Sequence, residues 1–252
     1  MITILTGAGV STDSGIPDFR GPQGLWRQFP DYEKLVDLEA YSGDPAIRKR
    51  AWQFREASPA RTAEPNVAHL ALAELERKGA LDTVITQNID RLHQKAGLDD
   101  ERVVELHGDM FGIVCLGCDF TSTLEEVLER VRSGEEDPAC ERCGGVLKTT
   151  TVMFGEFLSP QRLKRAEEAA ERAEVFAAIG TSLQVYPAAA LVGIAARAGA
   201  EIVIVNADPT PYDGLADEIV REPISTAVPE LVERLAARAE GRLVQGRHRT
   251  RH

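Results

Sequence analysis

The sequence predicts an α/β fold in which a parallel sheet is covered by helices and a smaller module is inserted. Three observations predict this fold. Short apolar runs, such as residues 2–5, 83–86 and 175–179, are each followed by glycine or polar residues. Amphipathic helical patterns separate the runs, an alternation typical of parallel sheets. All four cysteines lie in one segment, 115–143, which interrupts the alternation.

Composition limits the possible function classes. The chain has 252 residues, 43% hydrophobic and 27% charged, which is ordinary for a globular protein. Its net charge of −11 argues against nonspecific nucleic-acid binding and is compatible with a basic peptide substrate. No run approaches the roughly 20 apolar residues that span a bilayer, and the first residues do not form a signal peptide. We therefore expect a cytoplasmic protein without disulfides.

The first strand, 2–5, runs into a glycine-containing loop that ends at Gly21. Gly7 and Gly9 allow a ligand to approach the backbone closely, and residues 11–14 suit a helix N-cap, so a pyrophosphate fits here. The G-x-G-x-x-G fingerprint nevertheless fails, because Thr12 takes the third glycine's position. A tight turn without a ligand therefore stays open as an alternative.

Two helical segments follow. Residues 32–58 contain no strand pattern and predict two short helices, one of them begun by Asp44 and Pro45. A second amphipathic segment predicts a helix from Pro65 to a stop at Gly79. Its apolar face is expected to consist of Val67, Leu70, Ala71 and Leu75.

Polar residues follow the next two predicted strands. The strand 83–86 leads into Gln87, Asn88, Ile89 and Asp90, and the strand 103–106 leads into His107. Ligands of open α/β sheets bind outside the carboxyl ends of strands, so this placement suggests a site. A structural role for a lone histidine such as His107 stays open at this point. His69 and His93 lie on predicted helices, where surface or packing roles are expected.

The strongest generic motif is a pair of C-x-x-C sequences separated by 21 residues. Four thiolates form the closed tetrahedron that a structural Zn²⁺ prefers, with no open position for a catalytic water. A redox pair is the alternative, but it accounts for only half of the cysteines. A short helix over 124–131 is expected between the pairs. The expected zinc ligands are Cys115, Cys118, Cys140 and Cys143.

The last third of the chain predicts a second strand–helix–strand unit. The strand 175–179 ends in Gly180, the helix 187–198 is stopped by Gly199, and the strand 202–205 ends in Asn206. Such a unit can hold a phosphate and a ribose, although an ordinary crossover without a ligand is equally compatible. The other elements expected here are a strand over 151–154, a helix over 160–173, a strand over 218–221, a helix over 229–239 and a disordered basic tail over 241–252.

Together these motifs resemble the sirtuin family of NAD-dependent protein-lysine deacylases. The resemblance covers nearly the whole chain. The matching stretches, in the family's order, are GAGVSTDSGIPDFRG (7–21), TQNIDRLH (86–93), LHG (106–108), the two C-x-x-C pairs, FGE (154–156), GTSLQVYPAA (180–189) and IVIVNAD (202–208).

The resemblance implies a Rossmann-like large domain and a small module made of a helical insert and a zinc ribbon. NAD would lie in the cleft between them as a cosubstrate, and one structural zinc would lie in the ribbon. The implied segments are 1–31, 64–111 and 151–240 for the large domain, 32–63 for the helical insert, 112–150 for the zinc-binding module and 241–252 for the tail.

Site residues follow from the resemblance position by position. Gly7, Ala8 and Gly9 would face the pyrophosphate, and Asp18, Phe19 and Arg20 the nicotinamide end. Gln87 and Asn88 would contact the nicotinamide ribose, and Ile89 and Asp90 the carboxamide. Gly180, Thr181, Ser182, Asn206 and Asp208 would serve the adenosine half, with Ser11, Trp26 and Ala207 as further cofactor contacts. The acyl-lysine peptide would lie as a strand between Gly155-Glu156 and Val185-Tyr186.

The implied reaction transfers the acyl group of a lysine to ADP-ribose. The acyl oxygen attacks C1′ of the ribose as nicotinamide leaves, and an alkylamidate forms. His107 then acts as general base on a ribose hydroxyl, with Asn88 as the second catalytic residue. The products are lysine, nicotinamide and O-acyl-ADP-ribose. A mono-ADP-ribosyltransferase and a catalytically weak NAD-binding interaction module are the alternatives.

The sequence departs from the family pattern at two informative places. The segment before FGE reads Leu147-Lys148-Thr149-Thr150-Thr151, where many members have an Arg-Pro, so the resemblance does not fix how the chain leaves the zinc module. Trp52-Gln53-Phe54-Arg55 is the nearest match to the Tyr-x-x-Arg of members that prefer acidic acyl groups. Because tryptophan replaces the tyrosine, desuccinylation is not predicted.

Overall fold

The computed structural model describes residues 1–21 and 24–249, with side chains as far as residue 241. Its centre is a six-stranded sheet of order β3-β2-β1-β7-β8-β9, in which every neighbouring pair is parallel. The predicted Rossmann-like α/β fold is confirmed. The strand order reverses at the boundary between β1 and β7, where open sheets of this kind form their ligand crevice. The strands are β1 (Ile2–Thr6), β2 (Leu81–Thr86), β3 (Val103–Glu105), β7 (Val175–Ile179), β8 (Glu201–Val205) and β9 (Glu218–Val220).

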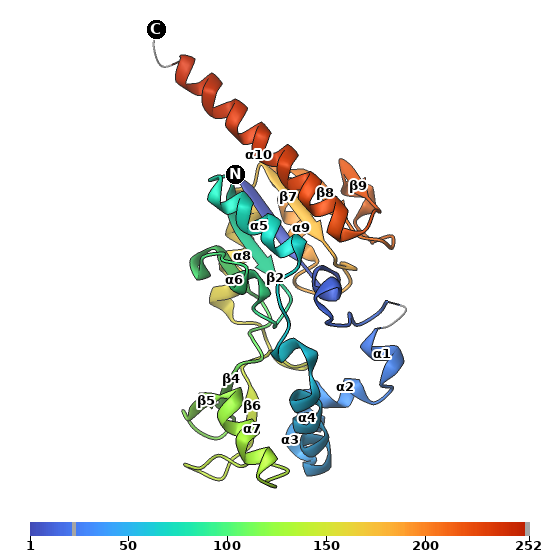
Figure 1. Cartoon of the computed structure of the whole chain (residues 1–252), viewed down its shortest axis with the longest axis vertical. Helices are drawn as coiled ribbons and strands as arrows, with labels where there is room; N and C mark the ends of the chain where they lie inside the picture. The colour runs from blue at the N-terminus through green and yellow to red at the C-terminus, as the bar shows by residue number, and fades with distance from the viewer. Residues whose placement is uncertain (22–23, 250–252) are drawn as a thin grey trace.

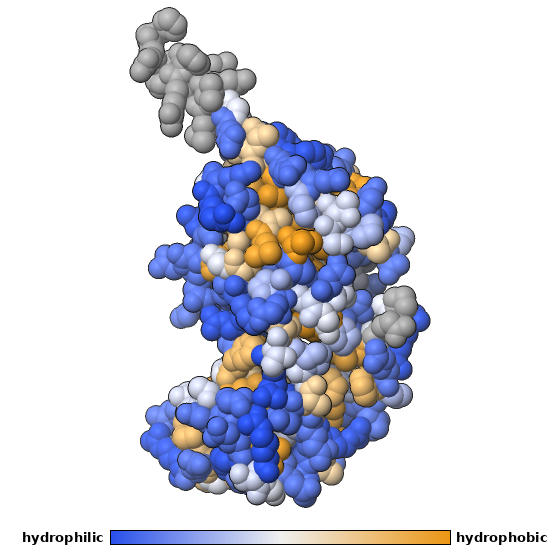
Figure 2. Space-filling view, in the orientation of Figure 1, coloured by the Kyte–Doolittle hydropathy of each residue, from blue (hydrophilic) through white to orange (hydrophobic). Residues whose placement is uncertain are grey.

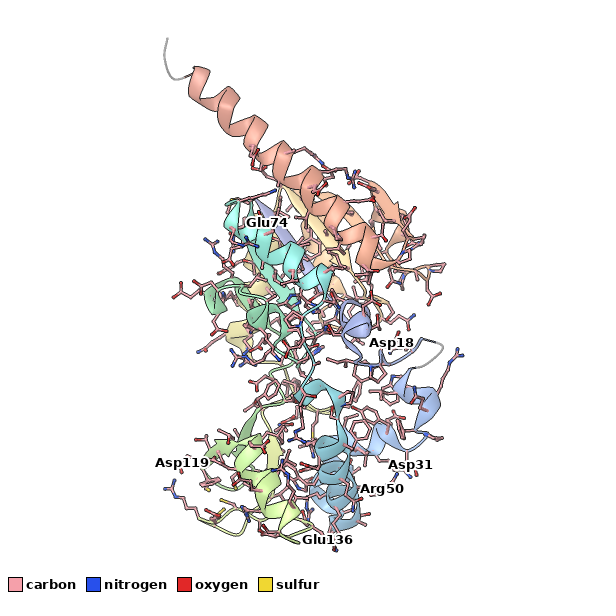
Figure 3. All side chains as sticks on the ribbon, viewed as in Figure 1. Asp18, Asp31, Arg50, Glu74, Asp119 and Glu136 are labelled. Atoms are coloured by element: carbon pink, nitrogen blue, oxygen red, sulfur yellow. The ribbon has the colours of Figure 1, made fainter. Side chains whose placement is uncertain are left out.

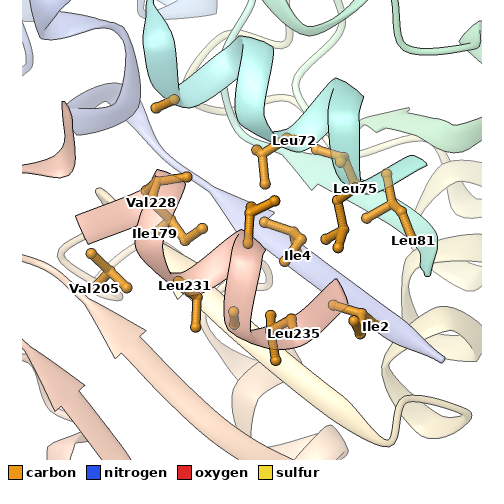
Figure 4. Close-up of a cluster of buried hydrophobic side chains, with 14 of the residues drawn as sticks. Ile2, Ile4, Leu72, Leu75, Leu81, Ile179, Val205, Val228, Leu231 and Leu235 are labelled. Atoms are coloured by element: carbon orange, nitrogen blue, oxygen red, sulfur yellow. The ribbon is translucent and has the colours of Figure 1, made fainter. Parts of the chain in front are cut away.

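Helices cover both faces of this sheet (Figure 1). Successive residues of β1 point to opposite faces, so Ile4 joins one buried cluster and Leu5 the other. Leu72 of α5 and Leu231 of α10 pack on the face of Ile4 (Figure 4). On the other face, α8 contributes mainly alanines, which lets this helix approach the sheet closely. The covering helices are α5 (Val67–Arg77), α8 (Pro160–Glu171), α9 (Ala190–Ala198) and α10 (Ile224–Arg249), and the short α6 (Leu92–Lys95) follows β2.

A smaller lobe lies beyond the carboxyl ends of the strands (Figure 1), and an indentation separates the two lobes on the face shown in Figure 2. It contains an antiparallel sheet of order β5-β4-β6 and two buried clusters of its own. Its elements are α1 (Leu25–Gln28), α2 (Tyr32–Leu35), α3 (Leu38–Gly43), α4 (Pro45–Ala57), β4 (Gly112–Cys115), β5 (Thr121–Thr123), α7 (Leu124–Arg132) and β6 (Leu147–Thr149).

Several predicted elements are corrected. The segment 32–58 holds three helices rather than two, because Asp37 caps an additional short helix, α3. Helix α5 begins at Val67, with Asn66 as its N-cap. Its predicted apolar face was partly wrong, because Val67 and Leu70 are exposed while Leu72 is fully buried.

The remaining corrections concern the second half of the chain. Residues 151–154 do not form a strand; the strand in this region is β6, which ends at Thr149. Helix α9 begins at Ala190 rather than Pro187. Helix α10 begins at Ile224 and includes Pro229. It continues through the predicted disordered tail as far as Arg249 and extends away from the body (Figure 1), and residues 250–252 lie outside the described part.

No helix among the described residues is both long enough and apolar enough to cross a membrane.

Candidate active site

Two glycine loops meet at the crevice between β1 and β7. The amide of Gly7 donates to the carbonyl of Ile179, and the amide of Gly9 donates to the carbonyl of Gly180. A Cβ on Gly9 would lie 2.9 Å from the Cα of Gly180, and a Cβ on Gly180 would lie 2.5 Å from the amide nitrogen of Val10. These glycines are therefore required, in the first place, because the two loops pack backbone against backbone.

The first loop contains a 3₁₀ helix, η1 (Ala8–Ser14), with Gly7 as its N-cap. This corrects the expectation that residues 11–14 cap a following helix, since they lie inside η1. Ser11 is buried and donates from Oγ to Oδ2 of Asp90 at 2.7 Å. The side-chain amide of Asn88 donates to Oγ of Ser11 and to the carbonyl of Gly7, both at 3.1 Å. The predicted site residues Ser11, Asn88 and Asp90 are thus in direct contact.

His107 lies at the same edge of the large sheet. Its Nδ1 is 2.9 Å from the carbonyl oxygen of Gln87. Because a carbonyl only accepts hydrogen bonds, Nδ1 carries the proton and Nε2 keeps a lone pair. Burial of the ring lowers the pKa of His107 below its ordinary value of 6.5, although the bond to Gln87 opposes this shift. The imidazole is therefore neutral at pH 7, as a general base must be.

The Gln87 side chain joins the two halves of the sheet. Its Nε2 donates to Oγ1 of Thr181 at 2.9 Å, and its backbone amide donates to the carbonyl of Thr6. Thr181 is buried, and its Oγ1 also accepts from the amide of Leu183. The loops after β1, β2 and β7 are therefore linked by direct hydrogen bonds.

Two buried histidines lie behind the first loop, where they have packing roles, one of the two roles that the sequence predicts for them. The rings of His69 and His93 are 5.0 Å apart, and both side chains are almost completely buried. His93 Nε2 contacts Oγ1 of Thr6 at 2.9 Å, and His69 Nε2 lies 3.5 Å from Oγ of Ser11. Burial lowers the pKa of His69 to about 4 and that of His93 well below 6.5. The sequence pattern did not indicate these contacts, because a histidine on a helix fits the same pattern whether it faces solvent or a polar core.

The second half of the first loop lies between the lobes, where Figure 3 places Asp18. Oδ1 of Asp18 accepts from the amide of Gly21 at 2.8 Å, which holds the loop in a turn. The Phe19 ring is partly exposed and lies 6.0 Å from the ring of Trp26, which in turn lies 6.0 Å from that of Phe154. Arg20 is exposed beside them. These rings connect the first loop to the FGE segment.

The predicted adenosine residues lie at the carboxyl end of β8. Asn206 Nδ2 donates to the carbonyl of Asp208 at 2.8 Å, and Arg221 donates to the carbonyls of both residues. Arg221 also pairs with the Asp213 carboxylate. The sequence pattern did not indicate Arg221, which follows β9 directly and anchors this loop. Ala207 is exposed and Ser182 half-buried in the neighbouring loop.

The predicted peptide-binding residues lie on two exposed turns. Gly155 has a φ of +89°, a conformation that favours glycine, and Glu156 is partly buried behind it. Val185 is partly buried and Tyr186 is 68% exposed, with its hydroxyl 3.2 Å from that of Tyr212. The side chain of Ile89, a predicted carboxamide contact, packs against a buried cluster of the smaller lobe.

The four cysteines come together in the smaller lobe, away from these loops. Their Sγ atoms all lie within 4.8 Å of one another, with Cys115–Cys143 at 3.5 Å and Cys118–Cys140 at 3.7 Å. A tetrahedral zinc with bonds of about 2.3 Å requires sulfur separations of about 3.8 Å. The amides of Gly117 and Gly145 point at Sγ atoms, which suits thiolates. The donor set therefore fits a closed zinc site and is not arranged as disulfides.

Comparison with known proteins adds independent findings. The model of the Sir2 family matches residues 7–187. "NAD-dependent protein deacetylase 2" of Streptomyces coelicolor is 56% identical over 93% of this chain and 98% of its own length. "NAD-dependent protein deacylase 2" of Archaeoglobus fulgidus is 44% identical over 91% of this chain and 89% of its own.

Solved structures are similar throughout the chain. A Sir2 structure with a deacetylated peptide and 3′-O-acetyl ADP ribose gives a TM-score of 0.86 at 36% identity, covering 94% of both chains. A Sir2 structure bound to a propionylated peptide gives 0.82 at 36% identity, covering 93% of this chain and 92% of that one.

Proposed function

This chain belongs to the Sir2 family, and we propose that it is an NAD-dependent protein-lysine deacylase that acts on acetyl-lysine peptides. The observation that carries the proposal is the bond between Nδ1 of His107 and the carbonyl of Gln87. It leaves a neutral imidazole nitrogen as a base at the edge of the sheet where the glycine loops meet. A neutral imidazole at this position is the base that deprotonation of a ribose hydroxyl requires.

The proposed reaction consumes NAD as a cosubstrate. The acyl oxygen of the substrate bonds to C1′ of the ribose, and the bond to nicotinamide breaks. Nε2 of His107 then removes a proton from a ribose hydroxyl, whose oxygen attacks the acyl carbon. Water completes the release of the lysine amine, and the acyl group stays on ADP-ribose. Asn88, fixed by Gly7 and Ser11, would hold the ribose in position.

NAD is assigned to the crevice at the carboxyl ends of β1 and β7. The pyrophosphate would lie against Gly7, Ala8 and Gly9, and the adenosine against the loop that Arg221 anchors. The nicotinamide end would lie near Asp18, Phe19 and Arg20, with Asp90 toward the carboxamide. The contacts among Ser11, Asn88 and Asp90 support this assignment because they fix these groups before a ligand arrives. The bond from Gln87 to Thr181 does the same for the Gln87 side chain.

The acyl-lysine peptide is assigned to the two exposed turns, 155–156 and 185–186. A structural zinc is assigned to Cys115, Cys118, Cys140 and Cys143, whose donor set supports it. Four thiolates leave no ligand position for water, so the metal would stabilise the smaller lobe and take no part in acyl transfer.

An acyl-peptide panel tests the proposal. The protein is incubated with acetyl-, propionyl- and succinyl-lysine peptides, with and without NAD, and nicotinamide release is followed. Release with the acetyl peptide that depends on both compounds is expected. Deacetylation without NAD would overturn the proposal. Label from NAD on protein would instead favour a mono-ADP-ribosyltransferase, and NAD binding without any nicotinamide release would favour an interaction module.

A further inference from the structure

Lys148 is a buried charge that lies outside the candidate active site described above. It lies on β6, where the zinc-module sheet ends, and its side chain is only 5% exposed. An ammonium group taken out of water requires charged or hydrogen-bonding partners, because an unpaired charge there is strongly destabilising. The structure provides three oxygen partners, one on the last residue of β6 and two on the chain that follows it.

The first partner is the Glu156 carboxylate. Lys148 Nζ lies 3.1 Å from Oε2 of Glu156, and the same oxygen accepts from the backbone amide of Met153 at 2.7 Å. The amide of Glu156 in turn donates to the carbonyl of Met153 at 3.0 Å. Residues 153–156 are therefore closed into a turn from both directions, and Lys148 neutralises the carboxylate that closes it.

The other partners are two backbone carbonyls. Lys148 Nζ donates to the carbonyl of Thr149 at 3.0 Å and to that of Thr151 at 2.9 Å. The next residue, Val152, donates its amide to the carbonyl of His107 at 2.8 Å. The segment that binds the Lys148 ammonium group thus contacts the backbone of His107 directly.

The same turn is held from the helical insert. The amide of Phe154 donates to the carbonyl of Val36, and the amide of Leu38 donates to the carbonyl of Phe154. Lys148 contributes the one positive charge at this junction among the contacts that the structure describes. Without it, the carboxylate of Glu156 would remain partly buried without its counterion.

We propose that Lys148 is a positioning residue for the acyl-lysine peptide: it fixes the Gly155–Glu156 turn, through the Glu156 carboxylate, at its place relative to His107. This inference rests on the proposed function, because it assigns the turn to peptide binding. Lys148 does not touch the substrate itself. Its effect should therefore appear in the binding of the peptide and not in the binding of NAD.

The test compares Lys148→Met, Lys148→Gln and Lys148→Arg in the full chain. The glutamine variant lacks the charge but can still donate to the two carbonyls. It therefore replaces the methionine variant in the comparison if the methionine variant does not fold. Lys49→Met is the matched control, since Lys49 lies in the smaller lobe and pairs with Glu136 at an exposed position. Steady-state kinetics gives KM for an acetyl-lysine peptide and for NAD, and thermal unfolding gives Tm.

We expect kcat/KM for the peptide to fall about 10- to 100-fold in Lys148→Met and Lys148→Gln, mainly through KM. KM for NAD should stay unchanged, and Lys148→Arg should restore most of the peptide affinity. In a Glu156→Gln background, removing Lys148 should have a smaller further effect, because the two act through one contact.

A lower Tm with an unchanged peptide KM would mean that Lys148 is only structural and would overturn the inference. Equal rises in both KM values would overturn it too. If the unaltered protein has no NAD-dependent turnover, the proposed function fails instead. Anisotropy of a fluorescent acetyl-lysine peptide then tests Lys148 without catalysis, and equal affinity of the unaltered protein and Lys148→Gln would contradict the inference.

Discussion

The Nδ1 atom of His107 lies 2.9 Å from the carbonyl oxygen of Gln87, and this contact fixes the tautomer of the imidazole. The proton is held on the side that faces the large sheet, and Nε2 is left basic. Burial keeps the ring neutral at pH 7 by lowering its pKa. The contact also joins the loops after β2 and β3, so the base is placed by the same backbone that positions Gln87.

Replacing this base should slow turnover strongly without unfolding the chain. In His107→Ala, kcat should fall about 10²- to 10⁴-fold, which is the usual contribution of a general base. Deacetylated peptide is measured by mass spectrometry, and Tm monitors folding. A variant with an unchanged Tm that keeps more than a tenth of the turnover would remove His107 from the mechanism.

The buried pair His69 and His93 should make the protein sensitive to acid. The pKa of His69 is lowered from 6.5 to about 4, so between these values the unfolded chain binds more protons than the folded one. The free energy of unfolding should therefore fall as the pH drops from about 6.5 to 4, by on the order of 3 kcal/mol for this group. Urea unfolding across this range measures the slope. His69→Gln, which cannot be protonated, should have a shallower slope, and an identical slope would contradict the assignment.

Because the two glycine loops pack closely, adding one methyl group at Gly9 should lower both the stability of the protein and its affinity for NAD. In Gly9→Ala the new Cβ would lie 2.9 Å from the Cα and carbonyl oxygen of Gly180, so one loop must move. We expect a destabilisation of about 1–3 kcal/mol and a higher KM for NAD. The matched control is Gly43→Ala, where a Cβ meets no atom within 4 Å. Similar NAD kinetics in both variants would show that the loops tolerate displacement.

Metal removal should loosen the smaller lobe. The purified protein is expected to contain about one zinc per chain, and a chelator should release it and lower Tm. Cys118→Ser should bind less zinc, whereas Leu116→Ser, which alters an exposed residue of the same knuckle, should bind the normal amount. Atomic absorption measures the ratio. A full zinc content in Cys118→Ser would place the metal elsewhere.

The sequence was most informative where local chemistry determines structure. The strand 175–179 was predicted with its observed bounds, because its run of buried apolar residues is bounded by polar residues and glycine. The cysteine pairs predicted a cluster that the structure contains, since C-x-x-C spacing alone brings two thiolates together. The parallel sheet followed from the alternation of strands and helices.

What depends on distant residues could not be read from the sequence. The periodicity of α5 did not show that His69 faces Ser11 and His93 rather than solvent, because this depends on how the helix is rotated against the sheet. Nor did Lys148 suggest a partner eight residues away, since only the fold returns Glu156 to it. The glycines of the first loop predict close approach of a ligand, and the structure shows that their missing Cβ atoms also make room for Gly180.

The central claim is that the acyl group leaves lysine for ADP-ribose, and the stoichiometry of the products tests it most directly. Acetyl-lysine peptide and NAD are incubated with the protein, and all products are quantified by mass spectrometry. We predict nicotinamide, deacetylated peptide and O-acetyl-ADP-ribose in equal amounts. Deacetylated peptide accompanied by free acetate and intact NAD would contradict the account.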